Sequence, residues 1–319
     1  QMTILIIGLG TIGTTYGYLF KKSGCEVEHY IRKDSPKSSI KEVQVSLLDG
    51  RKNKQGEESH DIYKVKKQSA TRYDFIFISV PSGEIEQVIE TLDEEGIFGT
   101  LVLACGIWED RSYLDRLLQG RDYILSYPVA GGNMLYHRLN CCVFDHFMLE
   151  KKKKTTISNY QELVQLFTDC QIHLEQPYDM LEWIWLHMGI NAGVISVIGR
   201  HRESGETTAV SAERLMTSSQ YLKEAVQTIR ETAKITAARG VRLGNYRREL
   251  LAYQLPTFIS VPLMKRLFAK NRLTRQIMTL HSNLNDLFFV CNSFYDYGKT
   301  NQIAAPVFYK AYEEALKKR

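Results

Sequence analysis

Short apolar runs alternate with amphipathic stretches over the first half of the chain. The pattern predicts strands over residues 3–7, 26–31, 74–80, 100–104 and 123–127, and helices over 11–22, 84–92 and 110–118. The run 74–80 (DFIFISV) is almost wholly apolar, which is typical of a parallel strand covered on both faces. Strands that alternate with helices predict an α/β fold, with an N-terminal Rossmann domain built on a doubly wound parallel sheet.

Two later stretches are less regular. Residues 35–68 are polar and charge-rich and are predicted to form loops with short strands. Residues 143–149 alternate like an exposed antiparallel strand, and the four lysines at 151–154 are interpreted as a solvated loop. A helix over 160–170 and a strand over 172–175 complete this part. Pro177 marks a predicted boundary, which makes 1–176 the first domain.

After Pro177 the hydrophobic pattern is helical throughout. Helices are predicted over 180–199, 209–239, 275–295 and 307–318, so 177–319 is expected to be an all-α domain for substrate binding or dimerisation. The apolar stretch 183–199 falls short of the roughly 20 residues that span a bilayer and is interpreted as a buried helix. The apolar positions of 284–291 fit an internal core or the seam of a homodimer equally well.

Composition and charge limit the partners. The chain has 319 residues, of which 44% are hydrophobic and 24% charged, with a net charge of +5. A mild positive excess suits a small anionic ligand, and without a basic stripe it does not favour nucleic acid. No cysteine pair has redox or zinc spacing, so we expect reduced thiols, no metal site and a cytoplasmic location without membrane partners. No targeting segment is expected at the start of the sequence.

The most informative motif is GLGTIG at residues 8–13. Gly8 permits the tight turn after the first strand, Gly10 allows close approach of a pyrophosphate, and Gly13 allows the helix to pack on the strand. Thr11 and Ile12 open the helix, whose N-terminal N–H groups and partial positive charge suit phosphates. A glycine motif between a strand and a helix at this position predicts a dinucleotide-binding site.

The ends of the next strands refine this site. The second strand is followed by Arg32 and Lys33, where NAD-binding proteins usually carry an acidic residue for the ribose hydroxyls. Two cations there favour NADP (NADPH), because guanidinium binds a 2′-phosphate through paired hydrogen bonds, although a solvated surface pair remains the alternative. We expect four more residues at carboxyl ends of strands to line the cofactor cleft: Val80, Pro81, Cys105 and Gly106.

Together these features resemble the ketopantoate reductase (2-dehydropantoate 2-reductase, PanE/ApbA) family. The resemblance rests on GLGTIG, Arg32, the strand FIFISV and the helical second half. Within that half, LEWIWLHMGIN at 181–191 is similar to the family pattern W-x-K-L-x-x-N, and 224–241 is similar to the family's long helix. The resemblance implies NADPH-dependent reduction of 2-dehydropantoate to pantoate, in pantothenate biosynthesis, with a helix lysine as proton donor to the ketone.

The catalytic positions depart from that family pattern. His187 stands at the position of the lysine, Asn191 keeps the asparagine four residues further on, and Asn283 stands where the family has a glutamate. The family's other asparagine falls on Cys105 and a second lysine on Pro81. An imidazolium is a competent proton donor near neutral pH, so His187 is either the donor or a core histidine of an apolar helix.

Three functions stay open at this point. The favoured one is an NADPH-dependent reductase of a 2-keto acid. The second is another NAD(P)-dependent dehydrogenase, of the prephenate or 3-hydroxy acid type, because the segment SYPVAGGN at 126–133 faintly resembles a motif of prephenate and arogenate dehydrogenases. The two glycines of this segment form either a carboxylate-binding turn or a plain turn. Asn271, Arg272 and Arg275 either bind an anionic substrate or form a solvated charged turn. A chain that kept the cofactor fold without its catalytic residues would be a non-catalytic NADPH-binding regulator.

Overall fold

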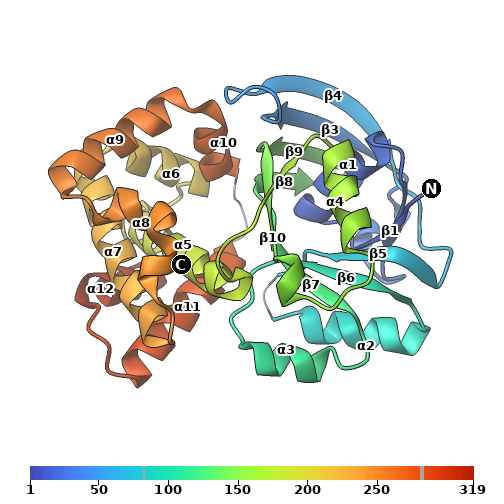
Figure 1. The fold of residues 1–319 in the computed structure, drawn as a ribbon. Coiled ribbons are helices and arrows are strands. Elements are labelled where there is room, and N and C mark those ends of the chain that lie inside the picture. Colours follow the sequence, from blue (N-terminus) through green and yellow to red (C-terminus); the bar gives the residue numbers. More distant parts are fainter. Residues whose placement is uncertain (82, 281–283) are drawn as a thin grey trace. The chain divides into compact units, whose positions relative to one another are not determined.

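The computed structural model describes residues 1–81, 83–280 and 284–319. These residues form two compact units, Gln1–Leu181 and Glu182–Arg319 (Figure 1). The domain limits inferred from the sequence, 1–176 and 177–319, stay a prediction about how function divides along the chain.

The first unit is built on a seven-stranded sheet. Its strand order is β11-β10-β7-β6-β5-β1-β2, in which β2, β1, β5, β6 and β7 run parallel and β10 pairs antiparallel with β7. The strands are β1 (Thr3–Ile7), β2 (Glu26–Tyr30), β5 (Arg72–Ile78), β6 (Phe98–Ala104), β7 (Tyr123–Tyr127), β10 (His146–Leu149) and β11 (His173–Glu175). The predicted fold class is confirmed. Because the order reverses beside β1, the carboxyl ends of β1 and β5 form the topological switch point of the sheet.

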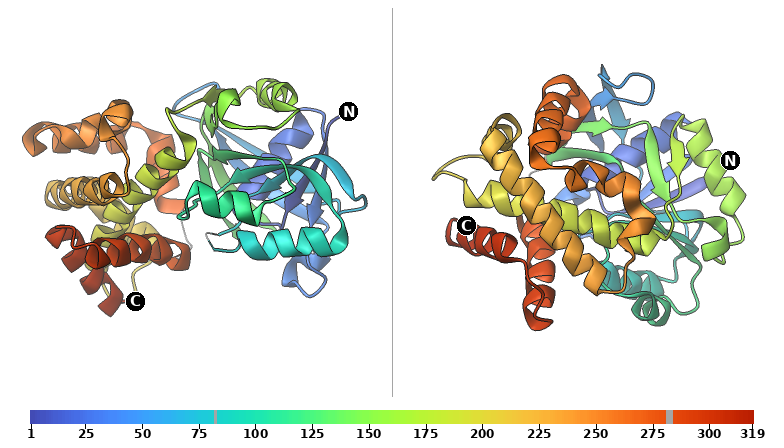
Figure 2. Two further views of the ribbon diagram at one scale, coloured as in Figure 1. Left: turned by 60° about the horizontal axis from the view of Figure 1, so that its bottom comes forward. Right: turned by 60° about the vertical axis from the view of Figure 1, so that its left-hand side comes forward.

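Helices cover both faces of this sheet. Those of the first unit are α1 (Thr11–Lys22), α2 (Ile85–Glu95), α3 (Arg111–Leu117) and α4 (Tyr160–Asp169). Figures 1 and 2 show α2 and α3 along one face, and α1 and α4 on the other. Under α1 and α4 the core is aromatic: Phe147 stacks on Phe167 at 4.4 Å, and Tyr16 meets Phe77 at 5.6 Å. These ring contacts fix α1 against the sheet.

A second sheet of four strands packs beside α1. Its order is β4-β3-β9-β8, from β3 (Glu42–Asp49), β4 (Glu57–Lys64), β8 (Ala130–Leu135) and β9 (Arg138–Val143). The prediction of loops with short strands for 35–68 was therefore wrong: β3 and β4 form one hairpin of eight paired positions. The single strand predicted over 143–149 was also wrong. Residue 143 is the last residue of β9, and residues 146–149 form the separate strand β10. Gly131 and Gly132 lie inside β8, paired with Cys142 and Cys141, and not in a turn.

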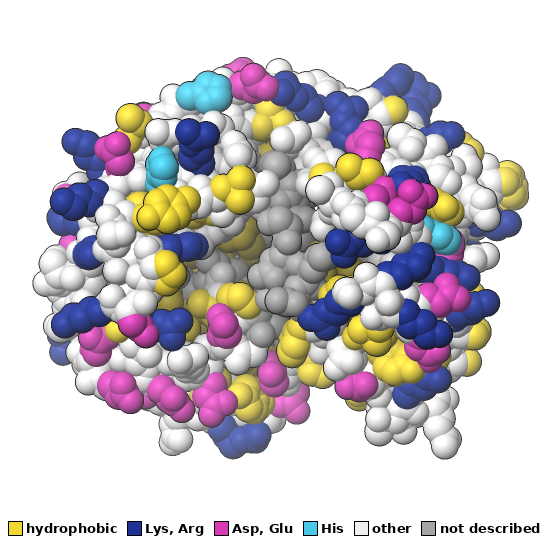
Figure 3. Space-filling model, turned by 180° about the vertical axis from the view of Figure 1, so that it is seen from behind, with side chains coloured by type: hydrophobic (Ala, Val, Ile, Leu, Met, Phe, Trp, Pro, Cys, Tyr) yellow, Lys and Arg dark blue, Asp and Glu magenta, His cyan; other side chains and the backbone are white. Residues whose placement is uncertain are grey.

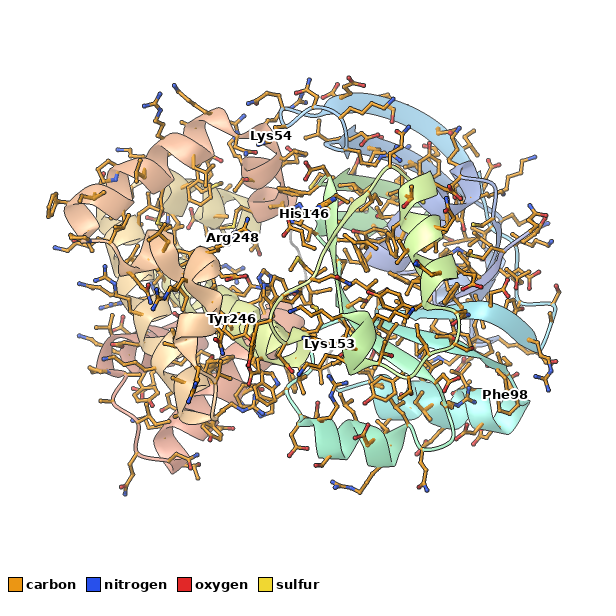
Figure 4. The ribbon with its side chains drawn as sticks, viewed as in Figure 1. Lys54, Phe98, His146, Lys153, Tyr246 and Arg248 are labelled. Carbon is orange, nitrogen blue, oxygen red and sulfur yellow. The ribbon has the colours of Figure 1, made fainter. Side chains whose placement is uncertain are left out.

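The second unit is helical over the part of it that the structure describes. Its helices are α5 (Met180–Arg200, which begins at the end of the first unit), α6 (Thr208–Thr217), α7 (Ser219–Ala238), α8 (Arg247–Gln254), α9 (Thr257–Lys270), α10 (Arg272–Leu280), α11 (Leu284–Thr300) and α12 (Pro306–Lys317). The single helix predicted over 209–239 is broken at Ser218, whose hydroxyl accepts from the Tyr221 N–H at 3.2 Å and caps α7. Tyr246, also labelled in Figure 4, is fully buried and donates to Glu182 at 2.7 Å.

One helix, α5, is long and apolar enough to cross a membrane, but 61% of its most apolar window is buried within the protein. That burial is what a core helix shows. On the face displayed in Figure 3, basic, acidic and hydrophobic side chains are interspersed. Lys54, in the β3–β4 hairpin, and Lys153, on the short 3-10 helix Lys152–Lys154, are both exposed (Figure 4).

Candidate dinucleotide-binding site

A pocket of about 350 Å³ opens at the carboxyl ends of β1, β2 and β5. This is the switch point of the sheet, where open α/β folds bind their ligands. The pocket lies wholly within the first unit. It is lined by Ile7, Gly8, Leu9, Gly10, Tyr30, Ile31, Arg32, Ser35, Lys37, Ser79, Val80, Pro81, Glu84, Gln87, Val88, Thr91 and Leu92.

The glycine-rich turn forms one wall of this pocket. Gly8 adopts φ of +81°, a left-handed conformation that glycine enters without strain. Gly10 is the N-cap of α1, so Thr11 and Ile12 stand in the first turn, and Gly13 is buried on the side of α1 that faces Ile6 of β1. No acidic side chain occupies that first turn. The free N–H groups and the partial positive charge of the α1 N-terminus are therefore available to an anion.

Two side chains hold consecutive carbonyl groups of the turn. The His29 ring contacts the Gly8 oxygen through Nδ1 at 2.8 Å, and the Lys37 ammonium donates to the Leu9 oxygen at 2.8 Å. Burial lowers the pKa of His29 to about 4, so its ring is neutral at pH 7. The conformation of the turn is thus fixed by groups that the glycine motif does not contain.

The basic end of the pocket differs in part from the expectation. Arg32 lines it, whereas the exposed Lys33 is not among the lining residues. Lys37 takes part instead, half-buried, with its pKa lowered by that burial. The Ser35 hydroxyl accepts from the Lys37 N–H at 3.2 Å and caps the 3-10 helix Pro36–Ser39. The Ser-Pro pair was a usable signal for this cap, but no sequence pattern says which way the lysine turns.

Helix α2 supplies a further wall that the sequence left unassigned. Gln87, Val88 and Thr91 face the pocket from α2, opposite Tyr30 at the end of β2. Burial, with a hydrogen bond to Glu95, raises the pKa of the Tyr30 phenol to about 12, so it stays protonated. This mixture of apolar, amide and hydroxyl groups suits a flat heteroaromatic ring.

Of the residues expected at other strand ends, Val80 and Pro81 line the pocket, and Cys105 and Gly106 are not among its lining residues. Cys105 follows directly after β6 and is buried. Burial raises the pKa of its thiol to about 12, so the reactive thiolate is not populated at neutral pH. Within the described residues, no group of three or more His, Cys, Asp and Glu side chains is placed to hold a metal ion.

The catalytic candidates of the second unit are brought together only in part. His187 and Asn191 lie four residues apart on α5, which places them on one face of that helix. The His187 ring stacks on Trp183 with centroids 4.8 Å apart, and burial lowers its pKa to about 4. The imidazolium expected near neutral pH is therefore not the resting form of His187. Asn283 lies outside the described residues.

A smaller pocket, of about 280 Å³, lies within the second unit between α6, α9 and α10. Arg275 lines it together with Lys265, Met216 and Phe268, and Glu213 adds a negative charge. The Arg275 guanidinium donates to the Ala269 carbonyl at 3.3 Å. Asn271 and Arg272 are not among its lining residues.

A glycine turn at a helix N-terminus, set at the switch point of a parallel sheet, defines a Rossmann-type dinucleotide-binding domain. Residues 4–100 match the family described as ketopantoate reductase PanE/ApbA. The resemblance found in the sequence is confirmed over those residues, and over its whole length the chain has the fold of solved ketopantoate reductases.

Three solved structures illustrate the likeness of fold. A dimeric ketopantoate reductase from Staphylococcus aureus is 13% identical with a TM-score of 0.61, covering 99% of this chain and 98% of its own. D-mandelate dehydrogenase in complex with NADH is 15% identical with a TM-score of 0.66, and the match covers 99% of this chain and 98% of its own. A 2-dehydropantoate 2-reductase from Geobacter metallireducens is 14% identical with a TM-score of 0.64, covering 100% of both chains. No curated protein sequence matches the chain.

Proposed function

We propose that this protein is an NADPH-dependent reductase of a 2-keto acid, similar to ketopantoate reductase. The observation that carries the proposal is the basic end of the switch-point pocket, which both Arg32 and Lys37 line. Arginine and lysine together suit a ribose 2′-phosphate, which NADPH carries and NADH lacks. The structural neighbour D-mandelate dehydrogenase was solved with NADH and anilino(oxo)acetate, a 2-oxo acid, which supports the substrate class.

Each group has a proposed role. The glycine turn and the amides of Thr11–Gly13 would bind the pyrophosphate, and α2 with Tyr30 would bind the adenine. Val80 and Pro81 would contact the part of the cofactor that leads to the nicotinamide. Bound NADPH supplies the hydride. A carbonyl that accepts a hydride becomes an alkoxide and needs a proton, for which His187 and Asn191, with Asn283, are the candidates. The neutral His187 ring can donate an N–H hydrogen bond to the carbonyl oxygen of a substrate, and a substrate carboxylate beside it would raise its pKa. Lys33, Cys105 and Gly106 stay predictions as cofactor contacts.

The cofactor preference gives the first test. Replacing Arg32 with alanine should weaken NADPH binding about 10- to 100-fold, since a lost charge-assisted hydrogen bond costs about 1.5–3 kcal/mol. Lys37→Ala should do the same and also loosen the turn. NADH binding should change little in Arg32→Ala. Fluorescence titration of both cofactors measures this, with Lys41→Ala, at an exposed lysine that does not line the pocket, as the matched control. Equal affinity of the native protein for NADH and NADPH would contradict the proposal.

The proton donor gives the second test. We expect His187→Gln to lower kcat for reduction of a 2-keto acid by about 100-fold, the lower end of what a positioned acid contributes, with no change in NADPH affinity. His201→Gln is the control, because His201 follows directly after the same helix but pairs with Glu224 at 2.8 Å. Absorbance of reduced nicotinamide reports turnover of ketopantoate and of a panel of 2-keto acids. Tight NADPH binding without turnover of any of them would favour a regulatory protein.

The assembly and location follow from the same proposal. Homodimerisation through the helical domain is supported by the dimeric state named for the Staphylococcus aureus neighbour. A place in pantothenate biosynthesis depends on ketopantoate being the substrate. A cytoplasmic location agrees with six cysteines that are all free thiols.

A further inference from the structure

A buried pair of side chains contacts the glycine-rich turn from the protein interior. His29 is fully buried and Tyr63 is 2% exposed, and neither lines the dinucleotide pocket. We propose that His29 and Tyr63 are positioning residues for the dinucleotide: they set the direction of the peptide groups in the turn, so that its N–H groups face the pyrophosphate. The inference rests on the proposed dinucleotide function of this pocket.

The proton positions in this pair follow from the chemistry of the partners. A carbonyl oxygen only accepts, so the Nδ1 atom of His29 must carry the proton that it shares with the Gly8 oxygen. The ring is neutral, so Nε2 is left as an acceptor, and the Tyr63 hydroxyl donates to it at 2.6 Å. The tyrosine therefore selects the tautomer that binds Gly8. Without its hydroxyl, the opposite tautomer would set a lone pair against the carbonyl oxygen.

The Gly8 carbonyl matters because peptide groups are planar. All the described peptide bonds are trans, so the C=O of Gly8 and the N–H of Leu9 point in opposite directions. The Gly8 oxygen points inward, onto His29. We therefore infer that the Leu9 N–H points away from the core and toward the pocket, which Leu9 lines. The Lys37 bond to the Leu9 oxygen fixes the orientation of the next peptide group.

The rest of the structure holds this pair rigidly. Two backbone hydrogen bonds to the segment after β4 hold the backbone of His29. Its N–H donates to the Lys66 carbonyl at 2.8 Å, and its carbonyl accepts from the Gln68 N–H at 2.9 Å. The Tyr63 ring meets the His29 ring edge-on at 5.6 Å. A Cβ at Gly17 would lie 3.0 Å from the Tyr63 hydroxyl, so glycine there leaves room for it. Tyr63 comes from β4, which gives the second sheet a part in the cofactor site.

The test compares two tyrosine hydroxyls in the full-length protein. Tyr63→Phe removes the hydroxyl that fixes His29. The matched control, Tyr73→Phe, removes the hydroxyl of another buried tyrosine, which donates at 2.6 Å to Glu28, the residue before His29 on β2. We expect both variants to melt a few degrees lower. Only Tyr63→Phe should raise the Kd for NADPH, by about three- to tenfold, and His29→Leu should raise it more than tenfold.

A readout without cofactor separates this inference from the proposed function. Amide hydrogen exchange over residues 7–14 of the free protein should be faster in Tyr63→Phe than in Tyr73→Phe. If the native protein binds no dinucleotide, the proposed function fails, and the exchange comparison still decides whether the pair orders the turn. Equal exchange in the two variants, or equal Kd values for NADPH, would overturn the positioning role and leave the pair a structural contact.

Discussion

Replacing Arg111 with methionine should lower the free energy of unfolding by about 3–5 kcal/mol at neutral pH, because it leaves a buried carboxylate without its partner. The Arg111 guanidinium binds the Glu150 carboxylate, whose side chain is only 1% exposed. The second oxygen of Glu150 accepts from the Leu125 N–H at 3.3 Å. This pair joins α3 to the end of β10, so its loss loosens the edge of the main sheet.

The loss should also depend on pH in a defined direction. Burial raises the pKa of the Glu150 carboxyl above its ordinary value, and Arg111 opposes that shift. Removing Arg111 raises the pKa further. A carboxyl with a raised pKa in the folded state stabilises the protein below its unfolded pKa, and this stability is lost as the pH rises through the folded value. The deficit of Arg111→Met should therefore shrink as the pH falls from 7.5 and Glu150 takes up a proton.

Urea unfolding at several pH values measures this effect. Arg121→Met is the matched control, because Arg121 also pairs with a carboxylate and lies over the ring of Phe98, labelled in Figure 4, at 4.9 Å. Its partner Asp93, however, is 62% exposed. Its loss should be smaller and independent of pH, since water solvates the remaining carboxylate. The double variant Arg111→Met/Glu150→Leu should regain most of the stability. A deficit in Arg111→Met that stays constant with pH would show that Glu150 is not the cause.

The sequence predicted best where local signals agree with the fold. Helix α1 was predicted with its observed ends, because a glycine turn precedes Thr11 and Ser23-Gly24 follows Lys22. The hairpin of β3 and β4 was missed, although β3 alternates strictly at Val43, Val45 and Leu47. Its partner β4 is mostly exposed and polar, so it carries no apolar alternation, and only the pairing with β3 defines it.

The residues of the candidate site also fall into those that local sequence signals predicted and those that they did not. Gly8, Gly10 and Arg32 were found from the sequence, because a turn and a strand end are local features. Lys37, His29 and Tyr63 were not, since each acts through a contact with a residue that is distant along the chain. His29 looks like an ordinary strand residue until the fold places it beneath Gly8, 21 positions away. No periodicity or spacing marks such contacts in a single sequence.

The second and third glycines of the motif, Gly10 and Gly13, should have different effects when each is replaced by alanine. A Cβ at Gly13 would lie 2.8 Å from Ile6 Cγ2 and 3.2 Å from the Ser79 hydroxyl, so a methyl group there pushes α1 away from β1. Overpacking of this kind costs about 1–3 kcal/mol. We expect Gly13→Ala to lose both stability and dinucleotide affinity, since a displaced helix carries its N-terminal amides with it.

Gly10→Ala should instead leave stability almost unchanged. A Cβ at Gly10 meets nothing within 4 Å, and its φ of −90° is open to any residue. The space that the methyl group would fill is the approach to the α1 N-terminus, where a pyrophosphate must come close to the backbone. The Kd for NADPH should therefore rise more than 30-fold while the urea midpoint stays within error of the native value. An unchanged Kd in Gly10→Ala would mean that no pyrophosphate lies against this turn, and the dinucleotide site would have to be sought elsewhere.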